Sequence, residues 1–319
     1  MEEYTQTPYP KIVRAPLKLS GVFGIAFQLY KRGFFQMFLL TLLLIGLAGM
    51  LMSGLPLYML KNIGFTDFFK NGITQFGHLS KEFDPGRMFG AIMGGGALSM
   101  LLSFIYAFLL SPAYFGAAFM EMNERAEGRC GSFSQLIRFA VPIGFKRFYT
   151  TYLSLFLVYL GGQIILSLIF GLIGGVFAVA AIVSAASNLN ILTFIVLGII
   201  LALILIVAVT VLVVFISLVY PVAAHEGKLA FNAVKRAFML ASKNFFRCFS
   251  ANLLFTLLSI FIIALFISPI FLFGDILNNP LLLTILSGLC GTLLTPYAVA
   301  FYTALYIDVA SRENAPLGV

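Results

Sequence analysis

Six long apolar runs alternate with short polar or basic stretches along the chain. They cover approximately residues 34–60, 88–120, 149–186, 191–224, 251–274 and 281–307. About 20 apolar residues suffice to cross the roughly 30 Å hydrocarbon core of a bilayer. The pattern therefore predicts an all-α, polytopic membrane helix bundle of about six transmembrane helices, built as one membrane domain over residues 1–319. The third run contains two Gly-Gly pairs that could break its helix.

The overall composition agrees with the pattern. Hydrophobic residues make up 61% of the chain and charged residues only 10%, whereas a soluble domain carries roughly 25% charged residues. The first run begins near residue 34 and follows Glu2 and Glu3. That position is too late for a cleaved signal peptide, so the run is predicted to stay as a membrane anchor.

The connections between the runs differ in length and charge. "SNLN" joins the third and fourth runs and "DILNNP" the fifth and sixth, which predicts tight helical hairpins. The segments before the first, third and fifth runs, together with the C-terminal tail, lie on one side of the predicted membrane and hold sixteen Lys and Arg residues. The other side, which includes residues 61–87, holds four. The positive-inside rule then predicts a multi-pass protein of the cell membrane with both termini in the cytoplasm.

A basic, amphipathic segment precedes each odd-numbered run. "LAFNAVKRAFMLASKNFF" has an apolar helical face with polar residues opposite, "SFSQLIRFAVP" is shorter and should stop at Pro142, and "SGVFGIAFQLYKR" is looser. We expect three cytoplasmic-side interfacial helices with the apolar face toward the membrane. In the third segment that face comprises Ala230, Val234, Ala237, Phe238 and Ala241, and the polar face Asn232, Lys235, Arg236 and Lys243.

The even-numbered runs also resemble one another. Each carries a proline near its cytoplasmic end, namely Pro112, Pro221 and Pro296. Proline removes a backbone donor and bends a helix, so a kink is expected at each. Together these features predict a threefold internal repeat over residues 17–127, 128–227 and 228–312.

The stretches "AFNAVKRAFMLASKNFFRCF" and "TPYAVAFYTALYIDVASRE" resemble the glycerophosphoryl diester phosphodiesterase membrane domain and related bacterial membrane proteins of unknown function. The resemblance covers most of residues 15–315 through short, loose motifs. In proteins named for that domain a separate soluble barrel hydrolyses the phosphodiester. The resemblance therefore implies a membrane module without that activity.

Few residues suggest chemistry. His78 and His225 fall on opposite sides of the predicted topology, and Cys130, Cys248 and Cys290 lack metal or disulfide spacing. No phosphate-binding loop, nucleophile elbow or zinc motif occurs, so we expect no enzyme, cofactor or metal. Basic residues are spread among loops, which argues against nucleic acid as a partner.

Two functions fit these features. In the first, a basic cytoplasmic collar engages membrane lipid, chiefly anionic, or a protein partner. Its expected headgroup contacts are Lys31, Arg32, Lys146, Arg147, Lys235, Arg236, Lys243 and Arg247. In the alternative, the chain is a transporter or permease for a small, weakly polar or amphiphilic solute. That reading expects polar groups such as Gln163 and Tyr297 to line a cavity near mid-membrane.

Overall fold

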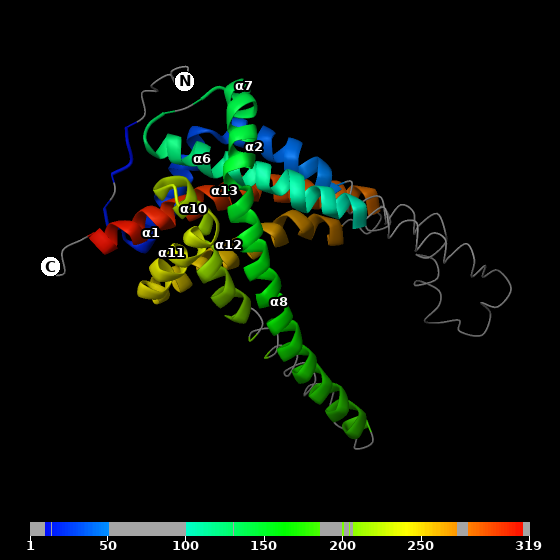
Figure 1. Ribbon diagram of the computed structural model, residues 1–319. Helices are drawn as coiled ribbons and strands as arrows, with labels where there is room; N and C mark the ends of the chain where they lie inside the picture. Colours follow the sequence, from blue (N-terminus) through cyan, green and yellow to red (C-terminus); the bar gives the residue numbers. More distant parts are fainter. Residues whose placement is uncertain are drawn as a thin grey trace. The chain divides into compact units, whose positions relative to one another are not determined.

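The computed structural model describes residues 10–13, 15–50, 100–129, 131–185, 200, 204, 207–272 and 280–314. Within these ranges the chain forms helices and their connections, without a β-strand (Figure 1). The predicted all-α class is thereby confirmed. The predictions for residues 61–87, for the bends of the two hairpins, for His78 and for Cys130 lie outside the described residues.

The apolar runs form helices long enough to cross a membrane. By length and composition, the described part of the chain holds five such helices, or six if a bent pair counts as one span. They are Met100–Ala126, Val141–Ile165, Val207–Glu226, Phe245–Phe266, Gly288–Glu313 and the pair Leu19–Arg32 with Phe34–Met50. Each overlaps one predicted run, so the chain is an integral membrane protein of the predicted polytopic kind.

The chain divides into two compact units that interleave along the sequence. The first unit comprises Met1–Lys11, Phe27–Lys146 and Leu258–Ala300, and the second Ile12–Ala26, Arg147–Leu257 and Phe301–Val319. The helices of each unit are described separately below.

Helix α1 (Leu19–Arg32) begins in the second unit and ends at Gly33 of the first, where the chain bends by 80° into the helix Phe34–Met50. That second helix begins as α2 (Phe34–Thr41) and continues through a π-helical stretch, η1 (Leu42–Gly46). Both pack against α6 (Ser111–Ala126), which follows a second π-helical stretch, η2 (Tyr106–Leu110).

The short helix α7 (Phe133–Gln135) opens the next helical segment with a capping box. The Ser132 side chain accepts from the Gln135 N–H, while the Gln135 side chain accepts from the Ser132 N–H. The π-helical stretch η3 (Leu136–Ala140) and the helix α8 (Val141–Ala185) follow directly. Helix α8 runs for 45 residues, so neither Gly-Gly pair breaks it.

The expected stop at Pro142 is wrong, because the helix continues through it. Both Pro112 and Pro142 lie two residues after a π-helical stretch, η2 in one case and η3 in the other. A π-turn shifts backbone hydrogen bonding by one residue, which accommodates a proline that lacks its N–H. The widened turn therefore explains why these two prolines do not end their helices.

Pro221 and Pro296 do not follow a π-helical stretch within the described residues. A turn at residues 217–218 separates the helical residues 207–216 from α10 (Val219–Glu226), and Pro221 lies in the first turn of α10. Proline is tolerated there because the first helical N–H groups have no partner inside the helix. Pro296 lies inside the uninterrupted helix α13 (Pro280–Asn314). A bend at Pro296 stays a prediction.

Helices α6 and α8 approach closely at two glycines in the first unit. A Cβ added to Gly116 would lie 2.6 Å from the Gly144 carbonyl oxygen, and one added to Gly144 would lie 2.7 Å from the Ala117 nitrogen. Both obstacles are backbone atoms, which a side-chain rotation cannot move. Small residues let membrane helices pack backbone against backbone in this way.

We expect Gly144→Ala to lower the midpoint of thermal unfolding in detergent, with a cost of about 1–3 kcal/mol for the overpacked contact. Gly161→Ala is the matched control, because Gly161 lies on the same helix α8 and has nothing within 4 Å of the added Cβ. Fluorescence-detected size exclusion after heating measures both variants. Equal midpoints for the two would show that the close approach is not needed.

Candidate functional site

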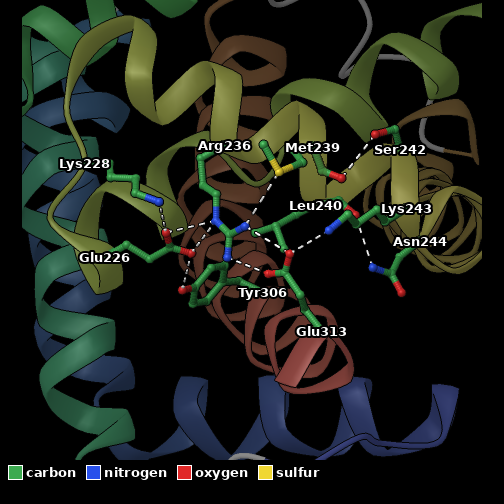
Figure 2. Close-up of polar contacts among 10 residues, drawn as sticks. All are labelled: Glu226, Lys228, Arg236, Met239, Leu240, Ser242, Lys243, Asn244, Tyr306 and Glu313. Carbon is green, nitrogen blue, oxygen red and sulfur yellow. Dashed lines mark hydrogen bonds and ion pairs between the residues drawn. The ribbon is translucent and has the colours of Figure 1, made fainter. Parts of the chain in front are cut away.

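A cluster of charged side chains in the second unit centres on Arg236 (Figure 2). Arg236 lies on α11 (Ala230–Lys243), between Glu226 at the end of α10 and Glu313 near the end of α13. Its Nε lies 3.0 Å from both Glu226 carboxylate oxygens. Its Nη1 and Nη2 lie 3.1 and 2.6 Å from the two Glu313 oxygens. One guanidinium thus joins the middle of α11 to the ends of α10 and α13.

Three further side chains bind the carboxylates of Glu226 and Glu313. Lys228 Nζ lies 2.9 Å from Glu226 Oε2, and the Tyr306 hydroxyl donates to Glu226 Oε1 at 3.1 Å. Lys243 Nζ lies 3.0 Å from Glu313 Oε1. The hydrogen bonds to Glu313 and the charge of Glu226 raise the pKa of Arg236 above its ordinary value. A carboxylate with this many donors is suited to hold structure rather than to accept a proton from a substrate.

A second cluster surrounds Asp308, whose side chain is fully buried. Arg247 Nε, on α12 (Phe245–Leu272), lies 2.8 Å from Asp308 Oδ2, and Arg312 Nε lies 3.1 Å from Oδ1. The Leu17 N–H donates to Asp308 Oδ1 at 2.7 Å, while the Leu17 carbonyl accepts from both arginines at 2.8 and 2.6 Å. The chain before α1 is therefore fastened to α12 and α13.

The first unit also contains a cluster around an ion pair, which is buried and lies on α6. Glu121 and Arg125 form an i,i+4 ion pair at 2.8 Å, with side chains 1% and 0% exposed. Arg125 Nη2 lies 2.5 Å from Gln36 Oε1, and Arg32 Nη1 donates to the Arg125 carbonyl at 3.3 Å. The Arg125 guanidinium also occupies the place that a Cβ on Gly33 would take. Only glycine leaves this space at the bend.

The helix breaks before α2 and α12 are alike. Gly33 has φ −146° and ψ 26°, and Asn244 has φ −121° and ψ 32°. The residue three positions after each break contacts an ion pair. Gln36 contacts Arg125 of the pair on α6, and Arg247 contacts Asp308 of the pair on α13. The pairs share their i,i+4 spacing. This correspondence is what the predicted repeat requires of its first and third copies, and the threefold repeat itself stays a prediction.

The eight cations expected to contact headgroups divide into two groups. In the first group the side chains are exposed, and no ion pair holds them within the described part of the chain; these are Lys31, Lys146, Arg147 and Lys235. In the second group the side chains contact the protein itself; these are Arg32, Arg236, Lys243 and Arg247. Lys243 belongs to the second group although its side chain is 56% exposed.

The apolar face of α11 packs against the protein. Its buried residues are Ala233, Val234, Ala237, Leu240 and Ala241. Phe238 stacks on Phe215 of the helical residues 207–216, with ring centroids 5.1 Å apart. The expectation that this face points toward the membrane is therefore wrong, because the rest of the second unit already covers it.

The two polar groups expected in a cavity lie in different units. The Gln163 amide donates to the hydroxyl of Tyr159, one turn earlier on α8, at 2.7 Å. Tyr297 of the first unit packs edge-to-face on Tyr30, with centroids 5.6 Å apart. The Tyr30 hydroxyl donates to the Leu293 carbonyl. Each group has a local structural role.

The acidic partners of the arginines were not identified from the sequence. A local signal existed for Glu121 with Arg125 and for Asp308 with Arg312, because residues four apart on a helix are neighbours.

Comparison with known proteins adds no assignment: no family model, curated protein or solved structure matches the chain.

We expect Arg236→Gln to lower the thermal unfolding midpoint in detergent, with a cost of about 1–3 kcal/mol, because it leaves two partly buried carboxylates without their shared cation. Lys235→Gln, one residue away on the exposed side of α11, is the control and should be nearly neutral. Similar midpoints for the two variants would contradict the bracing role of Arg236.

The buried pair on α6 gives a second test. Arg125→Met should cost about 3–5 kcal/mol in an SDS unfolding titration followed by circular dichroism, because Glu121 is left buried and uncompensated. The double variant Glu121→Gln/Arg125→Met should recover part of that loss, since neither charge remains. A double variant that is less stable than Arg125→Met alone would argue against a compensated buried pair.

Proposed function

We propose that the chain is a non-catalytic, multi-pass protein of the cell membrane whose basic cytoplasmic side binds anionic lipid headgroups. The proposal rests on one observation: some cations of the collar contact the protein itself, whereas others are exposed. Arg236 and Arg247 are engaged in holding helix ends together. Lys31, Lys146, Arg147 and Lys235 project from the protein instead.

The exposed cations have enough charge for this role. Each Lys or Arg near an anionic membrane surface contributes on the order of 1 kcal/mol. Lys146 and Arg147 are adjacent on α8, and the Arg147 guanidinium lies 5.8 Å from the ring centroid of Phe148. Such a basic and aromatic pairing is typical of the membrane–water interface.

The bend at Gly33 supports an interfacial position for α1. A helix that meets a membrane span at 80° runs nearly parallel to the bilayer surface when the span itself is nearly upright. Lys31 and Arg32 end α1 at this bend. The proposed orientation, with both termini cytoplasmic, places this basic end beside anionic headgroups.

The resemblance to the glycerophosphoryl diester phosphodiesterase membrane domain accords with this proposal, because that domain is a membrane module beside a separate catalytic barrel. An acidic surface of a protein partner would fit the same exposed cations. The lipid is favoured because each basic segment leads directly into a helix long and apolar enough to cross a membrane.

Native mass spectrometry of the purified protein with added anionic phospholipid tests the proposal. We expect the fourfold variant K31Q/K146Q/R147Q/K235Q to retain the lipid at least about tenfold more weakly, equivalent to about 1.4 kcal/mol. The control K11Q/R129Q/K228Q/K243Q removes the same number of charges from cations that are paired with carboxylates, so it should lose less.

If both variants lose lipid retention equally, the loss depends only on net charge, which would contradict a specific role of the four exposed cations. Unchanged lipid retention together with a co-purified acidic protein, lost in the first variant alone, would identify a protein surface as the partner instead.

A further inference from the structure

The side of α11 opposite its buried face carries large apolar side chains between its cations. Phe231 is 59% exposed and Met239 is 41% exposed. At about 100° per residue, these two and Lys235 fall within roughly 80° of one another on the helix. The buried alanines occupy the opposite side. The helix thus has a second, largely exposed apolar surface, in which the Met239 sulfur also accepts from Arg236 Nη1 at 3.9 Å (Figure 2).

This surface leads directly to a membrane span. Helix α11 ends at Lys243, and α12 begins after the single residue Asn244. Phe246, in the first turn of α12, is 82% exposed. Phe35 stands at the same distance after the break at Gly33 and is 68% exposed. The candidate span Phe245–Phe266 begins two residues after Lys243, which favours a position of the end of α11 at the membrane surface.

The charge of the surface fits one kind of occupant. No Asp or Glu occurs between Gly227 and Leu272, so every charge that α11 carries itself is positive. Aromatic and thioether side chains beside Lys are typical of helices that lie in the headgroup region, with apolar groups at the acyl boundary and cations among phosphates. Burying Phe231 and Met239 at the acyl boundary would remove their apolar surface from water.

We infer that α11 lies in the membrane interface on its outer side, with Phe231 and Met239 inserted at the acyl boundary of a phospholipid leaflet and Lys235 at the headgroups. This inference deepens the proposed function and rests on its placement of the basic side at the lipid surface. It also reverses the orientation expected from the alanine-rich face.

The chain contains no tryptophan, so a single introduced Trp reports one position. F231W and F246W are reconstituted in nanodiscs of neutral phospholipid whose acyl chains are brominated near the headgroup end, since bromine quenches Trp on contact. F261W is the lipid-facing control, because Phe261 is 61% exposed on α12. F148W is the buried control, because Phe148 is fully buried.

We expect brominated lipid to quench F231W and F246W at least half as strongly as F261W, while F148W stays bright. Bromine near the tail end of the chains should quench F261W more and F231W less, which reports depth. Elution as a single symmetric peak confirms that each variant is folded.

Two results would overturn the inference. One is an F231W signal that brominated lipid leaves as bright as F148W and that aqueous iodide quenches. The other is quenching at Phe246 alone, because Phe246 belongs to α12. Neutral nanodiscs carry no anionic headgroup, so this readout does not depend on whether the exposed cations bind anionic lipid, and the two proposals fail separately.

Discussion

A charged side chain that is buried at the end of a membrane helix cannot lie unpaired, and the described structure depends on how the chain meets this constraint. Removing an ion from water costs several kcal/mol even after relaxation. Glu121, Glu226 and Asp308 stand near the ends of α6, α10 and α13, and each is joined to at least one arginine. The apolar spans can therefore end in carboxylates without leaving a buried charge uncompensated.

These pairs also fix the helices that connect the spans. Arg236 holds α11 to the ends of α10 and α13, and Arg247 with Arg312 holds the backbone of Leu17. The guanidinium suits this task because its planar donors reach a carboxylate in two places at once. Lysines at neighbouring positions, such as Lys235, stay exposed at the protein surface.

The spans were predictable because burial in lipid requires long apolar runs, and all six runs overlap helices in the structure. The ion pairs were harder, since Arg236 and Glu313 lie 77 residues apart in sequence and only folding brings them together. The face of α11 was misassigned because hydrophobic spacing does not tell lipid from protein. Its alanines held a usable signal, as small residues favour close helix packing. Prolines marked local irregularities, but the π-helical stretches before Pro112 and Pro142 depend on backbone hydrogen bonding that residue type alone does not reveal.

We propose that paired cations hold the fold while exposed cations bind lipid, and a salt titration of the unaltered protein separates these two roles. Retention of a fluorescent anionic phospholipid and the thermal unfolding midpoint are measured on one sample as NaCl rises from about 0.05 to about 1 M, over which the Debye length shrinks several-fold. We expect lipid retention to fall steeply while the unfolding midpoint changes little, because buried pairs are screened far less than exposed charges. Lipid retention that is insensitive to salt, or a midpoint that falls together with it, would contradict the division.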